Sequence, residues 1–213
     1  LLEPLDHGEL PPAPDGTPAA RDFLPGALTR CGVTHTVYAT VIAYNREAFP
    51  GRRPRRVEDL FDRERFPGRR ALQRVPEGNL EWALLAYGVP REDVYDLLST
   101  ERGLELALER LAGVAREALW WRDAARPAEL LTAGEAVMAS GYNGRFFAAA
   151  AAGAPIEILW DGALLEHETW GIVRGTPRRE AAAEFIRFAT ATGPLVDQAR
   201  IIAPGLPQRS VLL

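Results

Sequence analysis

The chain has 213 residues, of which 47% are hydrophobic and 25% are charged, and its formal net charge is −4. This composition is ordinary for a globular protein and excludes a disordered chain. Because acidic residues outnumber basic ones, the chain lacks the basic surface of a nucleic-acid-binding protein, and a cationic ligand suits it better than a polyanion.

Cysteine content and the start of the chain bear on redox chemistry and location. Cys31 is the only cysteine, so no intrachain disulfide can form, and we expect this side chain to pack as a small hydrophobic group. No apolar run is long enough for a membrane span, and no signal segment opens the chain. The chain starts at Leu1 rather than at methionine, and we therefore expect a processed product or a fragment.

The first third combines a proline-rich start with strand-like runs. Six prolines among residues 1–30 predict a loop that lies on the surface. The β-branched and aromatic run 33–45 predicts one long strand or two consecutive strands. A short helical face follows at 57–62, and a short strand is predicted at 69–74.

The middle of the chain is predicted to be mainly helical. The apolar spacing indicates helices at 79–87, 91–98 and 103–118. Leu119-Trp120-Trp121 is the strand expected after them, and a further helix is predicted at 127–131, where a proline stands in the first turn.

The last third carries the stretch on which the functional prediction depends. Residues 136–140 are small or apolar and predict a buried strand, and residues 141–144 turn the chain into a helix at 146–152. Further strands are predicted at 156–160 and 169–173, with a helix at 178–189. Strands that alternate with helices at this spacing predict a mixed or parallel α/β sheet.

In open α/β sheets, ligands bind beyond the carboxyl ends of the strands, close to the N–H groups that open the next helix. Tyr142 and Asn143 fall at that position. Rings and carboxylates near strand ends can hold an alkylammonium ligand, because the rings stack against its carbons and the carboxylates balance its charge. The other candidates of this kind are Tyr38, Trp160, Trp170, Glu81, Asp161, Glu166 and Glu168.

The sequence offers little for metal or covalent chemistry. His7, His35 and His167 have no partners at metal-ligand spacing, and no phosphate-binding loop is present, so we expect neither a metal nor a cofactor. No Gly-x-Ser-x-Gly motif occurs. An enzyme would need a nucleophile beside a base, and Cys31 with His35 is the one pair close in sequence that could supply it.

Five motifs follow one another along the chain: FPGRRA from Phe66, GNLEWALLA from Gly78, SGYNGR from Ser140, ETWGIV from Glu168 and EAAAEFIRF from Glu180. From about Cys31 to the end, their order and spacing resemble bacterial extracellular solute-binding proteins of the spermidine/putrescine type. Such proteins deliver a solute to the membrane permease of an ABC importer.

The resemblance implies a type II periplasmic-binding-protein fold, in which two α/β lobes close on a ligand in the cleft between them. The expected domains are a first-lobe remnant with the hinge entry at 1–40, a complete second lobe at 41–160, and a hinge return with a further first-lobe remnant at 161–213. The first lobe is only partial, because the aromatic-rich start of that lobe has no counterpart here. Apolar surface is then expected to be exposed on the helix at 178–189.

The resemblance also implies roles for single residues. Tyr142 stands where polyamine binders carry an aromatic residue, and Glu168 where they carry an acidic one. We therefore expect Tyr142 to stack, Asn143 to orient the ligand, and Glu168 with Glu166 to bind ammonium groups. Tyr38 and Trp170 complete the predicted set. Val75 to Gly78 replace an acidic pair of the family, for which Asn79 or Glu81 would substitute in part.

We therefore expect a monomeric, non-enzymatic component of an ABC importer, periplasmic or extracellular, that binds a small cationic solute such as spermidine or putrescine. The alternatives are a binder of another solute on the same fold, such as an amino-acid-like compound, an opine or ferric ion, and an enzyme on the two-lobe fold.

Overall fold

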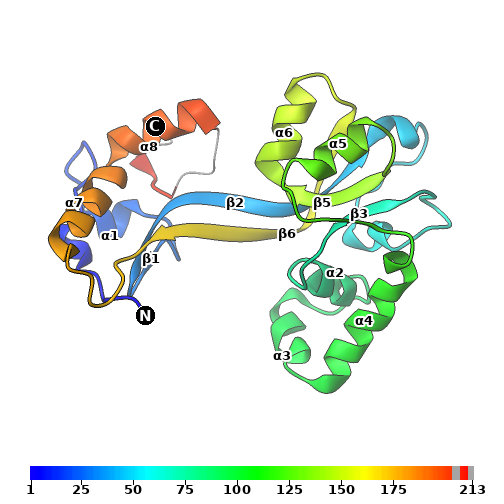
Figure 1. Ribbon diagram of the computed structural model, residues 1–213, viewed down its shortest axis with the longest axis horizontal. Helices are drawn as coiled ribbons and strands as arrows, with labels where there is room; N and C mark the ends of the chain where they lie inside the picture. Colours follow the sequence, from blue (N-terminus) through cyan, green and yellow to red (C-terminus); the bar gives the residue numbers. More distant parts are fainter. Residues whose placement is uncertain (203–206, 211–213) are drawn as a thin grey trace. The chain divides into compact units, whose positions relative to one another are not determined.

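The computed structural model describes residues 1–202 and 207–210, and the chain forms two compact units (Figure 1). Unit 1 comprises Leu1–Tyr38 and Leu165–Leu213, and unit 2 comprises Ala39–Leu164. The boundaries expected from the sequence lie at 40/41 and 160/161.

Unit 2 is built on a mixed sheet in which β2 (Gly32–Asn45), β5 (Met138–Tyr142), β3 (Arg70–Gln73) and β4 (Leu119–Trp121) are neighbours in that order. β5 is antiparallel to β2 and parallel to β3, and β3 is parallel to β4. The carboxyl ends of β3, β4 and β5 therefore meet at the same edge of the sheet, as the alternation of predicted strands and helices indicated.

Alternate residues of these strands enter two different hydrophobic clusters, because successive side chains of a strand point to opposite faces. Ile42 of β2, Leu72 of β3 and Met138 of β5 belong to one cluster. Their neighbours Val41 and Ala71 belong to the other cluster, together with Ala139 of β5. The sheet of unit 2 is thus buried on both faces, which explains why its strands are nearly uniformly apolar.

Each face is covered by its own helices (Figure 1). The first cluster includes residues of η3 (Val57–Leu60), α2 (Asn79–Leu85), α3 (Val94–Leu98) and α4 (Glu101–Ala115). The second includes residues of α5 (Arg126–Thr132) and α6 (Asn143–Ala151). Two short 3-10 turns, η2 (Arg46–Ala48) and η4 (Arg91–Asp93), complete unit 2. The predicted elements of this region are confirmed in kind, with ends that differ by a few residues.

Unit 1 has a smaller core, made mainly by segments from the two ends of the chain. It contains η1 (His7–Glu9), α1 (Ala19–Asp22), β1 (Leu28–Thr29), α7 (Arg179–Ala189) and α8 (Thr192–Ile202). Phe23 and Val33 pack with Ile172 and Ile186. The prediction that residues 1–30 form only a surface loop is therefore wrong in part: the prolines limit regular structure, but the apolar residues between them are buried in this core.

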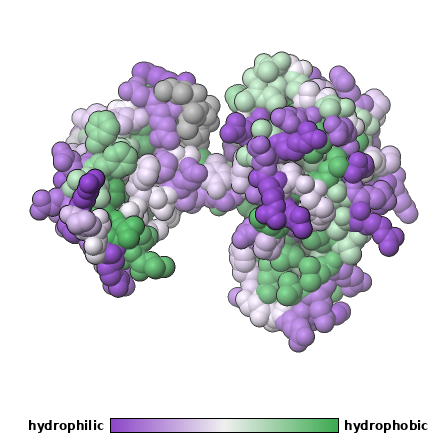
Figure 2. All heavy atoms as spheres, in the orientation of Figure 1, coloured by the Kyte–Doolittle hydropathy of each residue, from purple (hydrophilic) through white to green (hydrophobic). Residues whose placement is uncertain are grey.

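One further prediction is corrected, and another agrees with the structure. The strands predicted at 156–160 and 169–173 are one continuous strand, β6 (Ile156–Trp170), which pairs with β2. Gly162, at φ 76°, lies within this strand, where glycine often marks a local bend or bulge. On α7, Ile186 is buried, whereas Phe185 and Phe188 are exposed, in agreement with the expected exposure of apolar surface there. Figure 2 shows a further hydrophobic area of unit 1 beside the N-terminus, where Leu1, Leu2 and Val173 are exposed.

A buried arginine, Arg70, fixes the loop that precedes β3. Arg70 is 2% exposed and donates to the carbonyl oxygens of Leu60, Phe66, Gly68 and Asp62 at 2.7–3.2 Å. Burial, with a smaller contribution from Arg63, lowers the pKa of Arg70 to about 10, against the opposing effect of Asp62. The side chain is therefore still cationic at neutral pH and ties η3 and the loop after it to the sheet.

Among the residues that the structure describes, no helix combines the length and the apolar character needed to cross a membrane.

Candidate functional site

Gln73, Trp121 and Tyr142 lie together at the carboxyl ends of β3, β4 and β5. The sequence predicted such a strand-end position for Tyr142. The Gln73 amide donates from Nε2 to the Tyr142 hydroxyl at 3.2 Å. The Tyr142 ring lies edge-on to the Trp121 ring, with 6.3 Å between centroids. We call these three residues, with Asn79 and Asn143, the strand-end cluster.

The two asparagines of the strand-end cluster hold the backbone. Asn79 donates from Nδ2 to the carbonyl oxygens of Gln73 and Val75, at 2.8 and 2.7 Å, and so fixes the loop between β3 and α2. Asn143 accepts from the Ala39 N–H through Oδ1 at 3.0 Å. Both residues shape the strand ends, a role that the sequence alone did not indicate.

Two polar atoms of the cluster are buried and have no hydrogen-bond partner among the described residues. They are the Trp121 Nε1 donor and the Asn79 Oδ1 acceptor. A buried polar group without a partner is costly, and most such groups bind water or a ligand. The cluster therefore offers one donor and one acceptor in addition to the Tyr142 ring.

The first turn of α6 follows directly on this cluster. Tyr142 is the N-cap, no side chain caps the first turn, and the turn contains no acidic residue. Arg145 in the same turn is exposed, and no ion pair joins it to another described residue. Free N–H groups, the helix dipole and an arginine together favour an anion such as a carboxylate.

The predicted residues of unit 1 form a second group on β2 and β6. The Tyr38 hydroxyl donates to Glu166 Oε2 at 2.8 Å. The His35 ring stacks on Trp170 with 4.6 Å between centroids. Glu168 is close enough to raise the pKa of His35, although burial has the larger effect and lowers it. Tyr38, Glu166, Glu168 and Trp170 therefore lie on one small region of unit 1.

The geometry around His35 does not support a cysteine nucleophile. His35 Nδ1 forms a 2.9 Å hydrogen bond with Thr36 Oγ1, and its ring is covered by Trp170. No hydrogen bond joins Cys31 to His35 in the part of the chain that is described. Within the same part, no three His, Cys, Asp or Glu side chains are grouped so as to hold a metal ion.

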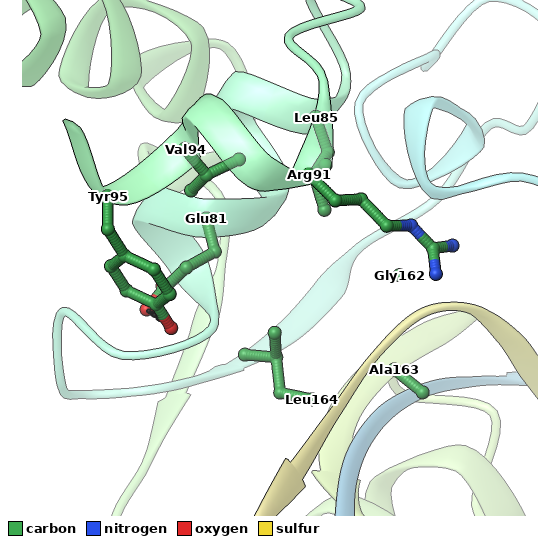
Figure 3. Close-up of a pocket in the computed structure, with 8 residues that line it drawn as sticks. All are labelled: Glu81, Leu85, Arg91, Val94, Tyr95, Gly162, Ala163 and Leu164. Carbon is green, nitrogen blue, oxygen red and sulfur yellow. Dashed lines mark hydrogen bonds between the residues drawn. The ribbon is translucent and has the colours of Figure 1, made fainter. Parts of the chain in front are cut away.

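Glu81 does not join the strand-end cluster. It lies on α2 and points to Tyr95, whose hydroxyl donates to Oε1 at 3.4 Å (Figure 3). This pair belongs to a pocket lined by Glu81, Leu85, Arg91, Val94, Tyr95, Gly162, Ala163 and Leu164. Asn79 and Glu81 are two residues apart on α2 and therefore about 200° apart around the helix, so their side chains make different contacts; a ligand-binding role for Glu81 stays a prediction.

Gln73 and Trp121 are cluster members that the sequence did not single out. Each is the last residue of a short strand, opposite the other in the β3–β4 register. Their position at a strand end was the one available signal. Which strands are neighbours could not be read from the sequence.

Comparison with known proteins adds to this geometry. A profile of the family described as "Bacterial extracellular solute-binding protein" matches residues 1–209. The gamma-aminobutyric acid (GABA)-binding protein of Pseudomonas aeruginosa is 39% identical over 193 residues, which are 89% of this chain and 54% of that protein. The chain thus spans about half the length of this curated relative.

Solved structures of binding proteins are also similar to this chain. The binding protein MotA of A. tumefaciens B6, in complex with glucopine, is 32% identical with a TM-score of 0.84, over 99% of this chain and 63% of that one. The Atu4243–GABA receptor is 27% identical with a TM-score of 0.85, over 99% and 62%. The spermidine/putrescine-binding protein PotD of Streptococcus pneumoniae is 13% identical with a TM-score of 0.77, over 99% of this chain and 64% of that one, and shows the fold alone.

These likenesses establish the α/β fold of periplasmic binding proteins, and the named relatives are binding proteins rather than enzymes. The family match covers residues 1–209, including the proline-rich start. The chain belongs to the bacterial extracellular solute-binding protein family.

Proposed function

We propose that the chain is the solute-binding part of a periplasmic component of an ABC importer, and that its solute is a small amine that also carries a carboxylate, such as GABA. The observation that carries this proposal is the 39% identity to a GABA-binding protein over 89% of the chain. The solved relatives that bind glucopine and GABA support the same class of solute.

The first turn of α6 supports a solute with a carboxylate. This turn has no acidic residue and no side-chain cap, and it contains Arg145. An anion near a helix N-terminus is stabilised by about 0.3–1 kcal/mol, and a cation is disfavoured by a similar amount. Spermidine and putrescine carry only cationic groups, so this turn suits them less well than it suits GABA.

The strand-end cluster would receive the rest of the solute on unit 2. The Tyr142 ring can lie against a short alkyl chain, and Trp121 Nε1 with Asn79 Oδ1 can complete its polar contacts. Asn143 would act by fixing the start of α6 rather than by direct contact. On unit 1, Glu166 and Glu168 remain the proposed ligands for an ammonium group, with Tyr38 and Trp170 beside them.

Calorimetric titration of the protein with GABA and with spermidine tests the proposal. We expect saturable heat with GABA and weaker binding of spermidine, which has no carboxylate for the α6 turn. Arg145→Gln should weaken GABA binding about three- to tenfold, because it removes one cation from the carboxylate site. Arg116→Gln removes an exposed arginine outside the candidate site, and should change the affinity less than about twofold.

Heat with spermidine and none with GABA would reject this proposal and support the polyamine solute expected from the sequence. GABA binding that is insensitive to Arg145→Gln would reject the carboxylate site while leaving the solute class intact. For the permease, co-purification of the protein with the membrane subunits encoded beside it is the corresponding measurement, and failure of any such complex to form would contradict the transport assignment.

A further inference from the structure

A pocket of unit 2 that lies outside the strand-end cluster contains a buried carboxyl group. Glu81 is the third residue of α2 and is 7% exposed. The pocket has a volume of about 90 Å³ and is formed by α2, by the segment from η4 to α3, and by β6. Figure 3 shows the Glu81 carboxyl group and the Tyr95 hydroxyl side by side at one end of it.

The Glu81 carboxyl group is incompletely satisfied. Its Oε1 accepts one long hydrogen bond, from the Tyr95 hydroxyl at 3.4 Å. Its Oε2 is buried and accepts no hydrogen bond from any described residue. An acidic residue in the first turn of a helix is favoured by the helix dipole, yet neither oxygen caps an N–H group of α2 among the residues described, so helix capping does not account for the position of Glu81.

The other residues that line the pocket are mainly apolar, and the Glu81 carboxyl group is the charge inside it. Leu85, Val94 and Leu164 form the walls. Arg91 also lines the pocket, but its guanidinium pairs with Asp161 at 3.2 Å, and in Figure 3 it points away from Glu81. A buried carboxyl group with a free oxygen, an adjacent hydroxyl and aliphatic walls is complementary to an ammonium group on a short alkyl chain.

We propose that this pocket is a second binding site, which takes the primary ammonium end of a small alkylamine. The ammonium donates to Glu81 Oε2 and shares Oε1 with the Tyr95 hydroxyl, and the first carbons of the chain lie against Leu85 and Leu164. One water needs about 10–15 Å³ of such space, so the pocket has room for several heavy atoms. The site goes beyond the proposed solute function, because it does not include the α6 turn or any member of the strand-end cluster.

Titration of the protein with n-propylammonium chloride, followed by NMR, tests this site. We expect saturable shifts at Tyr95 and Leu164. Glu81→Gln should weaken binding about tenfold or more, because the charge-assisted hydrogen bonds are lost. Glu92→Gln makes the same chemical change at an exposed position in the same segment, and should change the affinity less than about twofold.

Two further arms keep the result decisive. Leu164→Phe retains Glu81 but fills the pocket, and it should abolish the shifts while amides remote from the pocket keep their positions, which shows that the fold is intact. Tetramethylammonium has no N–H group and should give no saturable shift. Equal responses to propylammonium and to sodium chloride at matched ionic strength, or unchanged propylammonium binding in Glu81→Gln, would overturn the proposal and leave a pocket filled only by water.

Propylammonium carries no carboxylate, so it reports on this pocket whether or not GABA proves to be the solute. Failure of the pocket and failure of the proposed function therefore give different results: the first is the absence of propylammonium shifts at Tyr95, and the second is the absence of heat with GABA in the Leu164→Phe variant, whose pocket is filled.

Discussion

Replacement of Arg70 by methionine should destabilise unit 2 strongly. The guanidinium donates to four backbone carbonyls and is 2% exposed. Burial lowers its pKa to about 10, a lowering that corresponds to about 3 kcal/mol against the charged form. Methionine cannot donate, so the variant loses four charge-assisted hydrogen bonds and leaves the carbonyls unpaired, at about 1–3 kcal/mol for each buried acceptor, while removal of the buried charge offsets part of this loss.

Arg70→Met should therefore lower the free energy of unfolding by about 3 kcal/mol, which corresponds to a fall in Tm of about 6–12 °C for a chain of this size. Tryptophan fluorescence during urea denaturation is a suitable assay, because Trp82, Trp120, Trp121 and Trp160 lie in unit 2 and Trp170 in unit 1. Arg69→Met is the control, since Arg69 is exposed and donates to one carbonyl, that of Glu117. Equal losses in the two variants would refute the argument that Arg70 holds the entry to β3.

Three other predictions concern the strand ends and pH. Tyr142→Ala should weaken GABA binding about tenfold by calorimetry and Tyr142→Phe less, because the ring is retained; equal effects would contradict a stacking role. Gly141→Ala places a Cβ 2.7 Å from the buried Phe146 ring and should lower the free energy of unfolding by about 1–3 kcal/mol. The Cβ of Gly144→Ala meets nothing within 4 Å, and this control should be neutral or stabilising. Similar losses in the two variants would contradict close packing at Gly141. Burial lowers the pKa of His35 from 6.5, so the folded state binds fewer protons than the unfolded state, and the stability contributed by neutral His35 is lost as pH falls from about 6.5 through the folded pKa. The Tm of His35→Phe should therefore depend less on pH over this window. An unchanged pH dependence of Tm would contradict the assignment to His35.

Local sequence patterns predicted most elements of unit 2, because helices and strands follow the local periodicity of apolar residues. Ile42 and Val41 enter opposite clusters because successive side chains of a strand point to opposite faces. The turn predicted after residue 140 placed Tyr142 at a strand end. Predicted ends were displaced where strand and helix join without a loop: β5 continues to Tyr142 and α6 begins at Asn143.

The composition of the candidate site could not be predicted in the same way. Gln73 and Trp121 join Tyr142 through the pairing of strands far apart in the sequence, which no local pattern specifies. Asn79 and Glu81 were both expected to substitute for the acidic pair of the family, although α2 directs their side chains to different contacts. In unit 1, the prolines of residues 1–30 concealed a buried face that includes Leu10 and Phe23.

The solute class also shows the limit of motif resemblance. The motifs identified the family, which the profile match over residues 1–209 confirms. They favoured a polyamine because Tyr142 and Glu168 retain the chemical types found in polyamine binders. The α6 turn, with Arg145 and no acidic residue, and the identity to a GABA-binding protein favour an amino-acid-like solute instead.

We propose that the first turn of α6 receives the carboxylate of the solute. Backbone amide shifts of Gly144 and Arg145 measure this directly, in titrations with GABA and with n-butylamine, which has the same carbon chain but no carboxylate. We expect saturable shifts at both amides with GABA and none with n-butylamine. GABA that binds without moving either amide, or equal shifts with both compounds, would contradict it.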